Sequence, residues 1–325
     1  ERGVNLDALL TRSQNVFAHI AAMDTAVNVL VDAQTEEAAD DAVEQIIVND
    51  ELKLRFLNLV AGVDRLYCAI LPDPRAAEFS ARRRLLLFLA QKIRTLGPDV
   101  VLPDVETEMT TLLDDSIMAQ AYVIQAGARR YDLSKVDFEA LKQRFAEGRQ
   151  HTEAEKLRGT LNALLQRLVR RNRRRINYQE EFQRLIDAYN AGSANVETFF
   201  QELVDLAQQL NAEEQRHVRE NLSEEELAIF DILTRPGPEL SGAERKAVKQ
   251  IARDLLATLK REKLVLDWRK RQQYRAAVRL MIQDVLDQRL PARYDTELYN
   301  QKCDDVYAHI YDSYGGAGQS IYAAA

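Results

Sequence analysis

Two basic stretches hold the side chains best suited to chemistry with anions. Residues 157–177 contain seven arginines and no acidic residue. Residues 260–279 contain eight basic residues against two acidic ones. Arginine and lysine neutralise phosphate groups, and the resulting affinity falls as salt rises. The candidate DNA-backbone contacts are Arg170, Arg171, Arg173, Arg174, Arg175, Arg269, Lys270 and Arg271. The alternative is that these long side chains coat a helix surface or pair with acidic groups.

A tyrosine-rich segment forms a second candidate surface. Residues 290–314 include Tyr294, Tyr299, Tyr307, Tyr311 and Tyr314. Tyrosine suits an interface because it buries a large ring and keeps a polar hydroxyl. These residues are therefore candidates for docking a partner protein. The alternative is that the same tyrosines pack the last helix onto the body of the protein.

The sequence lacks the patterns of common active sites. None of the twelve glycines is followed by lysine, so the phosphate loop of many nucleotide-binding proteins is not encoded. The Pro-Asp pairs at Asp73, Asp99 and Asp104 have no later carboxylate–x–lysine partner of a magnesium-dependent nuclease. Cys303 and His309 lie six residues apart, on different faces of a helix. We therefore expect no catalytic residue and no metal site in this chain.

Apolar spacing predicts helices along most of the chain. The stretches 52–70 and 79–96 follow the helical repeat, with Asp50 as the expected cap of the first. The run 85–89 is apolar all round, which predicts the centre of the first lobe. Three capping boxes are expected, each a Ser or Thr followed three residues later by Glu. They are Thr152 with Glu155, Ser223 with Glu226, and Ser241 with Glu244.

Helix boundaries are also expected in the second half. A break is predicted near Asn172–Asn177, where the apolar stripe fails. Asp267 is the expected cap of a helix running to Pro291, and Asp295 that of a last helix. Only 264–266 resembles a short extended segment. The expected fold class is all-α, with two helical lobes and no substantial sheet.

Composition narrows the class of protein. The chain has 325 residues, 46% of them hydrophobic and 29% charged, so it can bury a core. Its 12 glycines and 7 prolines are too few for the turns of an all-β protein. No apolar run approaches the length of a membrane span, and no signal peptide is visible. Two isolated cysteines fit a reducing compartment, so we expect a cytoplasmic protein.

Charge divides the chain into parts. The net charge is −7, and all of the excess acid lies in residues 1–130. A mildly acidic chain is not typical of a free-standing nucleic-acid binder. The shift predicts a boundary near Gly127–Tyr131. The expected organisation is an acidic helical lobe at 1–130, a helical domain at 131–314 and a flexible tail at 315–325.

Several segments of the chain, taken in order, match the pattern of a known family. They start with Asp132-Leu-Ser-Lys-Val-Asp-Phe-Glu-Ala-Leu, Thr152-Glu-Ala-Glu-Lys-Leu-Arg, Tyr189-Asn-Ala-Gly-Ser and Leu222-Ser-Glu-Glu-Glu-Leu-Ala-Ile-Phe-Asp. They continue with Lys263-Leu-Val-Leu-Asp-Trp-Arg-Lys-Arg, Leu290-Pro, Tyr299-Asn-Gln-Lys-Cys and Val306-Tyr-Ala-His-Ile-Tyr. These segments resemble the C-terminal helical region of the motor (R) subunit of type I restriction enzymes. They cover roughly residues 131–314, with a looser likeness over 1–130.

The resemblance implies a fragment of a larger machine, which the first residue, Glu rather than Met, also fits. In this family the R subunit carries a Mg²⁺-dependent nuclease, two lobes that hydrolyse ATP and translocate DNA, and a helical end. ATP and Mg²⁺ are therefore expected only for domains outside this chain, which should itself be inert. The expected partners are the modification and specificity subunits of the methyltransferase core, with double-stranded DNA in the assembled complex and no membrane. The expected role is docking, and the alternative is guiding duplex DNA near the motor.

Overall fold

The computed structural model describes residues 7–9, 11–12, 14, 35–97, 138–265, 267–316 and 319–322. These residues are mostly helical, and their strands are two short segments near the C-terminus, so the expected all-α class is confirmed. The chain divides into two compact units. The first unit comprises Glu1–Ala163 and Phe182–Ala207, and the second unit comprises Leu164–Glu181 and Gln208–Ala325. The boundary expected near residue 130 lies outside the described residues.

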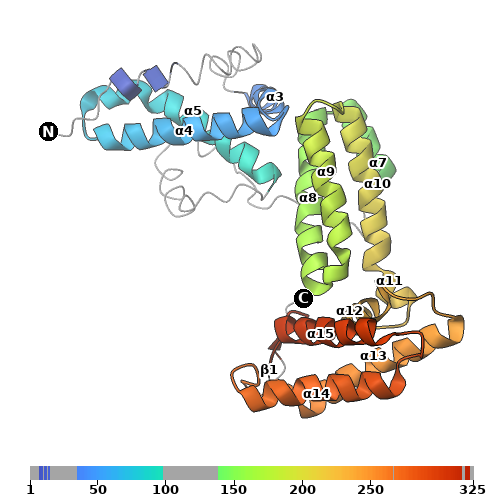
Figure 1. Cartoon of the computed structure of the whole chain (residues 1–325). Helices are drawn as coiled ribbons and strands as arrows, with labels where there is room; N and C mark the ends of the chain where they lie inside the picture. The colour runs from blue at the N-terminus through green and yellow to red at the C-terminus, as the bar shows by residue number, and fades with distance from the viewer. Residues whose placement is uncertain are drawn as a thin grey trace. The chain divides into compact units, whose positions relative to one another are not determined.

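The first unit begins with helices packed around an aliphatic core. They are α3 (Glu36–Ile46), α4 (Asp50–Ile70) and α5 (Ala77–Leu96), with a 3₁₀ turn, η1 (Pro74–Ala76), before α5 (Figure 1). Phe56 and Val60 of α4 pack with Leu86 and Leu89 of α5 in one buried cluster. Leu85 and Leu87 are only partly buried, so the apolar run of α5 is covered fully on one side.

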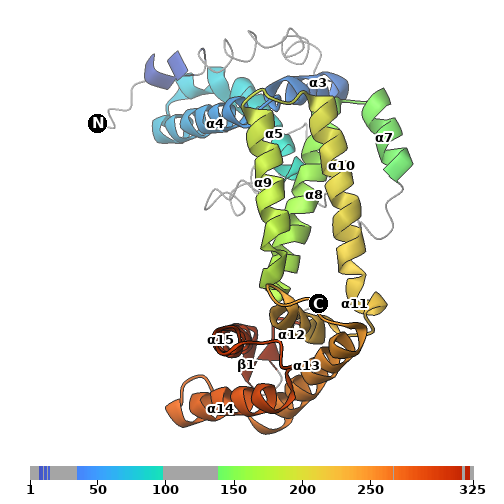
Figure 2. The same cartoon turned by 45° about the vertical axis from the view of Figure 1, so that its right-hand side comes forward.

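The next helices are α7 (Phe138–Glu147), α8 (Gln150–Arg171), α9 (Ile176–Asn190) and α10 (Val196–Glu214), and α8, α9 and α10 run side by side (Figure 2). Each of α8, α9 and α10 contributes residues to both units. Within the first unit, the ring centroids of Phe145 and Phe200 are stacked 3.8 Å apart. The rings of Tyr189 and Phe199 are stacked at 4.3 Å.

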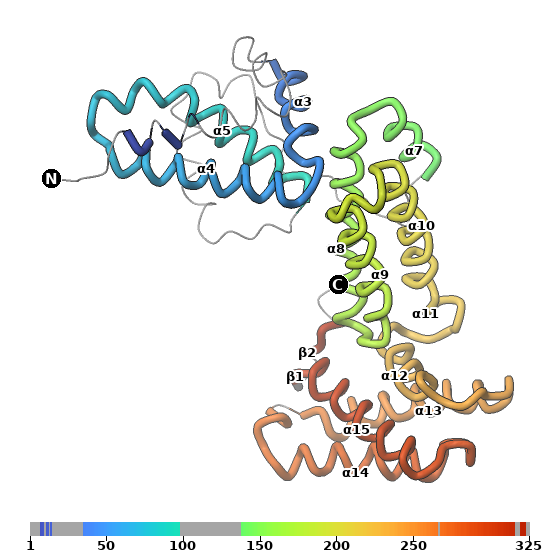
Figure 3. Tube along the Cα trace, turned by 45° about the horizontal axis from the view of Figure 1, so that its top comes forward, coloured from blue at the N-terminus to red at the C-terminus, as the bar shows by residue number. Residues whose placement is uncertain are grey.

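The second unit is centred on α12 (Glu224–Thr234), whose residues 227–233 are all buried. The short α11 (Arg216–Arg219) precedes it, and α13 (Gly242–Glu262), α14 (Gln272–Arg289) and α15 (Thr296–Ser313) complete the helices (Figure 3). Helix α12 packs against α13 and α15, and α14 packs against both as well. Trp268, with 0% exposure, lies in this core, and its indole Nε1 donates to the Tyr314 carbonyl at 3.1 Å.

The strands are β1 (Tyr314–Gly316) and β2 (Gln319–Ser320), paired antiparallel with Tyr314 opposite Ser320. Sequence patterns did not predict them. Residues 264–265, the described part of the expected extended segment, form no strand. These strands include described residues of the tail, 315–325, that was expected to be flexible. After the second strand, the Ile321 N–H donates to the Ser313 carbonyl.

Several helix starts differ from the prediction. Asn49, not Asp50, caps α4 by accepting from the Leu52 amide at 2.9 Å. Thr152 lies inside α8, so its predicted capping box with Glu155 is wrong. The cap at Asp267 is also wrong, because α14 begins at Gln272 and Asp267 adopts a φ of 57° in the preceding turn. Both serine capping boxes and the Asp295 cap are confirmed.

Candidate interaction surfaces

The first basic stretch lies where α8 ends and α9 begins. Asn172 follows the last residue of α8, and its side-chain oxygen accepts from the Arg174 amide at 3.0 Å. The next three residues form a 3₁₀ turn, η4 (Arg173–Arg175), and α9 follows at once. The predicted break is therefore confirmed. Its tight turn directs successive arginines to different surroundings, so they are not equivalent as binding residues.

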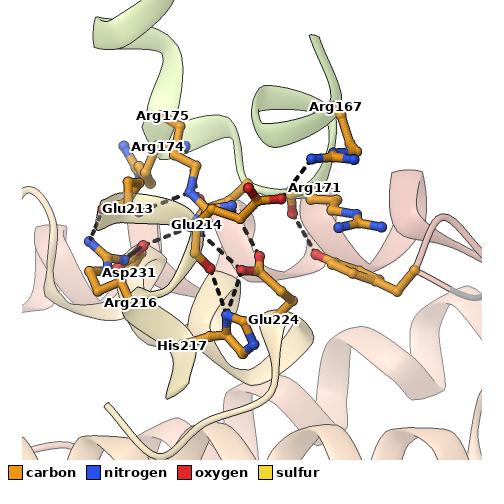
Figure 4. Close-up of polar contacts among 12 residues, drawn as sticks. Arg167, Arg171, Arg174, Arg175, Glu213, Glu214, Arg216, His217, Glu224 and Asp231 are labelled. Carbon is orange, nitrogen blue, oxygen red and sulfur yellow. Dashed lines mark hydrogen bonds and ion pairs between the residues drawn. The ribbon is translucent and has the colours of Figure 1, made fainter. Parts of the chain in front are cut away.

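Arg175 is buried, with 2% exposure, in an ion-pair cluster within the second unit (Figure 4). Its Nε donates to Glu213 at 2.9 Å and its Nη1 to Glu224 at 3.0 Å. Burial alone would lower the pKa of the guanidinium, but hydrogen bonds and charge from the two glutamates outweigh it and raise the pKa. A buried charge is tolerable only with such compensation.

Three further residues close the cluster around Arg175. Arg216 pairs with Asp231 and lies 3.4 Å from Glu213. Asn172 donates to the other side of the network, from Nδ2 to Asp231 Oδ2 at 2.7 Å. Two guanidinium groups thus face three carboxylates, Glu213, Glu224 and Asp231, with His217 Nδ1 3.2 Å from Glu224 (Figure 4). The charges of Arg175 and Arg216 are therefore neutralised by carboxylates within the second unit.

The other arginines of this stretch are nearer the surface. Arg174 pairs with Asp305 at 2.5 Å, and Arg173 pairs with Asp312 at 2.7 Å. Arg170 is exposed, and Arg171 is half-buried. Three of the five predicted phosphate contacts therefore already have carboxylate partners, as the alternative interpretation expects.

The second basic stretch combines arginines with tyrosine rings. The Arg269 guanidinium lies 5.3 Å from the Tyr311 ring centroid, and the Arg279 guanidinium lies 4.7 Å from that of Tyr307. Arg271 lies 5.8 Å from the ring centroid of Tyr274. Lys270 forms an ion pair with Asp267 at 2.9 Å, and both side chains are largely exposed.

The five candidate docking tyrosines divide into two kinds. Tyr294 donates to the Leu233 carbonyl at 2.9 Å and Tyr299 to the Gln283 carbonyl at 3.0 Å, and burial raises the pKa of both to about 12. Tyr314 is buried. Tyr307 is partly buried and Tyr311 is 37% exposed. Tyr294 and Tyr299 are thus hydrogen-bonded, and Tyr314 is buried, within the second unit. Tyr307 and Tyr311 remain as the candidates nearest the surface.

Sequence reasoning missed the buried Lys302. Its Nζ donates to the carbonyl of Ile232 in the last turn of α12 at 2.7 Å and to that of Pro236, just beyond the helix, at 2.6 Å. Burial lowers the pKa of Lys302 to about 8. The only sequence signal was its place on the same helical stripe as Val306, which is buried. Asp231 is a second buried charged residue of this kind, and its only sequence signal is its position within the apolar run of α12.

The described ranges contain no group of three or more His, Cys, Asp or Glu side chains arranged to hold a metal ion. Within those same ranges, no helix has the length and apolarity needed to cross a lipid bilayer. The buried Cys303 and His309 thus have no metal-site partners among the described residues.

Comparison with known proteins decides the family. The family described as "Type I restriction enzyme HindI endonuclease subunit-like, C-terminal" matches residues 10–312. The chain belongs to this family. The resemblance seen in the sequence is thereby confirmed, and it extends through the N-terminal part where the likeness was looser.

A relative of this restriction-subunit region occurs in Methanocaldococcus jannaschii. It is a protein provisionally named the MjaIXP type I restriction enzyme endonuclease subunit, 22% identical over 287 residues. The match covers 84% of this chain and 27% of the relative, so the chain spans about a quarter of that protein's length. No solved structure matches the chain.

Proposed function

We propose that this chain acts as a docking module of a type I restriction endonuclease subunit, coupling the ATP-dependent translocase and nuclease to the methyltransferase core. The observation that carries the proposal is the family match across residues 10–312. ATP hydrolysis and Mg²⁺-dependent DNA cleavage would belong to other parts of the subunit. The partners would be the modification and specificity subunits.

Two side chains are the best candidates for the docking contact. Tyr307 and Tyr311 lie on the surface side of α15 with ring centroids 6.2 Å apart. An adjacent pair of rings supplies the kind of area that interfaces bury at their centre. The other three candidate tyrosines contribute to internal packing and hydrogen bonds. We therefore narrow the docking proposal to these two rings.

Co-purification with the modification subunit tests this role. The Tyr307→Ala/Tyr311→Ala chain should lose most of the modification subunit recovered by the wild-type chain. Tyr294→Phe, which removes only an internal hydroxyl, serves as the matched control. Deleting residues 290–325 is unsuitable, because Val306 and Ile310 belong to the core of the second unit. Undiminished recovery by a folded double variant would contradict docking through these rings.

A second candidate function is contact with duplex DNA near the motor. It is favoured by one observation in the second basic stretch. Among the described residues, Arg269, Arg271 and Arg275 have no carboxylate within ion-pair distance. Wild-type chain should then bind duplex DNA at low salt, with affinity that falls as salt rises. Absence of measurable binding at low salt would remove this candidate.

A further inference from the structure

The arginine turn at residues 173–175 and the segment at residues 269–275 differ in how their charge is neutralised. Arg173, Arg174 and Arg175 each face a carboxylate within 3.0 Å. In the second stretch, Lys270 pairs with Asp267, while Arg279 lies 3.2 Å from Asp304. The three remaining arginines of residues 269–275 have no such partner in the described ranges. A guanidinium keeps its charge at all ordinary pH values, so this region carries uncompensated positive charge.

A buried anchor holds these arginines in place. Trp268 is buried between α13 and α14, and its indole ring meets Tyr311 edge-on at 5.8 Å. The backbone of Arg269 follows directly from this anchor, and its carbonyl accepts from Arg275 Nη1 at 2.8 Å. Arg271 stands at the start of α14, whose first turn carries no acidic residue. The charges are thus presented on a fixed base, which reduces the entropy lost on binding.

The neighbouring rings orient the guanidinium groups without consuming their donors. Arg269 lies over Tyr311 and Arg271 over Tyr274. Arg269 Nε is buried, so the Nη groups of Arg269 are its donors for phosphate, while Arg271 is exposed. The N–H groups of a guanidinium match phosphate oxygens. The guanidinium carbons of Arg269 and Arg271 lie 5.3 and 5.8 Å from the ring centroids, over one face of each ring, the face on which an unpaired base would stack. The arrangement therefore fits the backbone of a duplex better than single-stranded DNA.

We propose that Arg269, Arg271 and Arg275 form a binding site for the phosphate backbone of duplex DNA, an assignment that rests on the second proposed function. The contacts read no base sequence, since they engage phosphates alone. Arg173, Arg174 and Arg175 at the α8–α9 break then serve the fold, and the DNA-contacting role is assigned to the turn before α14. An acidic protein surface is the competing occupant.

Duplex binding by the full chain tests the site. The probe is a fluorescently labelled duplex of about 30 base pairs of arbitrary sequence, titrated between about 50 and 200 mM salt. The variant is R269A/R271A/R275A. We expect its affinity at the lower salt to fall at least about tenfold, and the slope of log affinity against log salt to shrink by about 3. The matched control is R289A/R293A, which removes two surface arginines paired with Asp254 and Glu244. This control should change the slope little.

Folding is followed in the same samples through Trp268, the only tryptophan of the chain. Should the triple variant fail to fold, R271A alone replaces it, because Arg271 is exposed and its side chain makes no hydrogen bond to the described residues. That single change should reduce the slope of log affinity against log salt by about 1.

Each outcome bears on a different proposal. If the wild-type chain binds no duplex, the second proposed function and this site fall together. If the wild-type chain binds duplex and the folded triple variant binds equally well, only this site is overturned. Tighter binding of single-stranded than of double-stranded DNA would also overturn it. Loss of co-purification with the modification subunit at unchanged DNA affinity would assign the three arginines to a protein partner instead.

Discussion

The hydroxyl of Tyr322 donates a 2.5 Å hydrogen bond to the backbone carbonyl of Arg171. Arg171 is the last residue of α8, so its carbonyl has no partner within the helix. The same hydroxyl lies 3.2 Å from Nε2 of the buried His309. Tyr322, two residues beyond β2, thereby caps the C-terminal end of α8 within the second unit.

Tyr322→Phe should test this cap. The change removes one hydrogen bond and leaves a carbonyl without its donor, which should lower the free energy of unfolding by about 1 kcal/mol. Urea unfolding followed by the fluorescence of Trp268 measures the second unit directly. Tyr274→Phe is the control, because the hydroxyl of Tyr274 makes no hydrogen bond within the described part of the chain. Its free energy of unfolding should stay within about 0.5 kcal/mol of that of the wild type. Equal losses in the two variants would contradict a specific cap.

Arg175→Ala should be much more damaging. It leaves Glu213 and Glu224 near one another without their shared cation, and breaking a buried ion pair costs about 3–5 kcal/mol. The same urea titration measures the loss. Arg170→Ala, at an exposed position five residues earlier in the same stretch, should change the free energy of unfolding by less than about 0.5 kcal/mol. An Arg175→Ala chain as stable as the control would show that the cluster contributes no net stability.

His309 should make the second unit sensitive to mild acid. Burial and the nearby charge of Arg173 lower the pKa of His309 to about 4, while Asp312 acts in the opposite direction. The unfolded chain keeps the ordinary value of about 6.5, so it binds the proton more readily than the folded chain between these two values. The contribution to stability is complete above pH about 6.5 and is lost as the pH falls toward 4.

Comparing urea midpoints at about pH 7.5 and 5 measures this dependence. The wild-type midpoint should fall more between the two pH values than that of His309→Gln, which carries no titrating ring. Parallel falls in the two proteins would assign the acid sensitivity to other groups.

Lys302→Met should expose the cost of two unsatisfied carbonyls. The Lys302 ammonium is 0% exposed and holds the carbonyls of Ile232 and Pro236. Methionine fills most of the volume but donates no hydrogen bond, so we expect a loss of about 2–4 kcal/mol in the unfolding free energy. Lys270→Met at the surface is the control and should be near neutral. A stable Lys302→Met chain would mean that water replaces the ammonium.

Local signals in the sequence were sufficient for the fold class. Ser223 and Glu226, three residues apart, satisfy each other's backbone amides at the start of α12. The start of α8 could not be predicted in this way. There Glu44 accepts from the amides of His151 at 2.6 Å and Thr152 at 2.8 Å, from more than 100 positions earlier in the chain. A long-range carboxylate replaces the local cap that Glu155 was expected to supply.

The candidate interaction surfaces were harder to predict, because they too depend on contacts between residues far apart in the sequence. Spacing identified the arginine turn at 170–175, but it did not reveal that Glu213 and Glu224 come from α10 and α12 to enclose Arg175. Side-chain exposure depends on such partners, and one-dimensional patterns do not contain them. The contrast between paired and unpaired arginines, which selects Arg269 and Arg271, is visible only in three dimensions.

Neither compact unit is one continuous stretch of the chain. The first unit consists of residues 1–163 and 182–207. The second unit consists of residues 164–181, which separate the two parts of the first unit, and residues 208–325. A single recombination event that exchanged either unit between related genes would therefore carry a piece of the other with it. Exchange of one complete unit without the other would need additional crossovers at the internal boundaries near residues 164, 182 and 208.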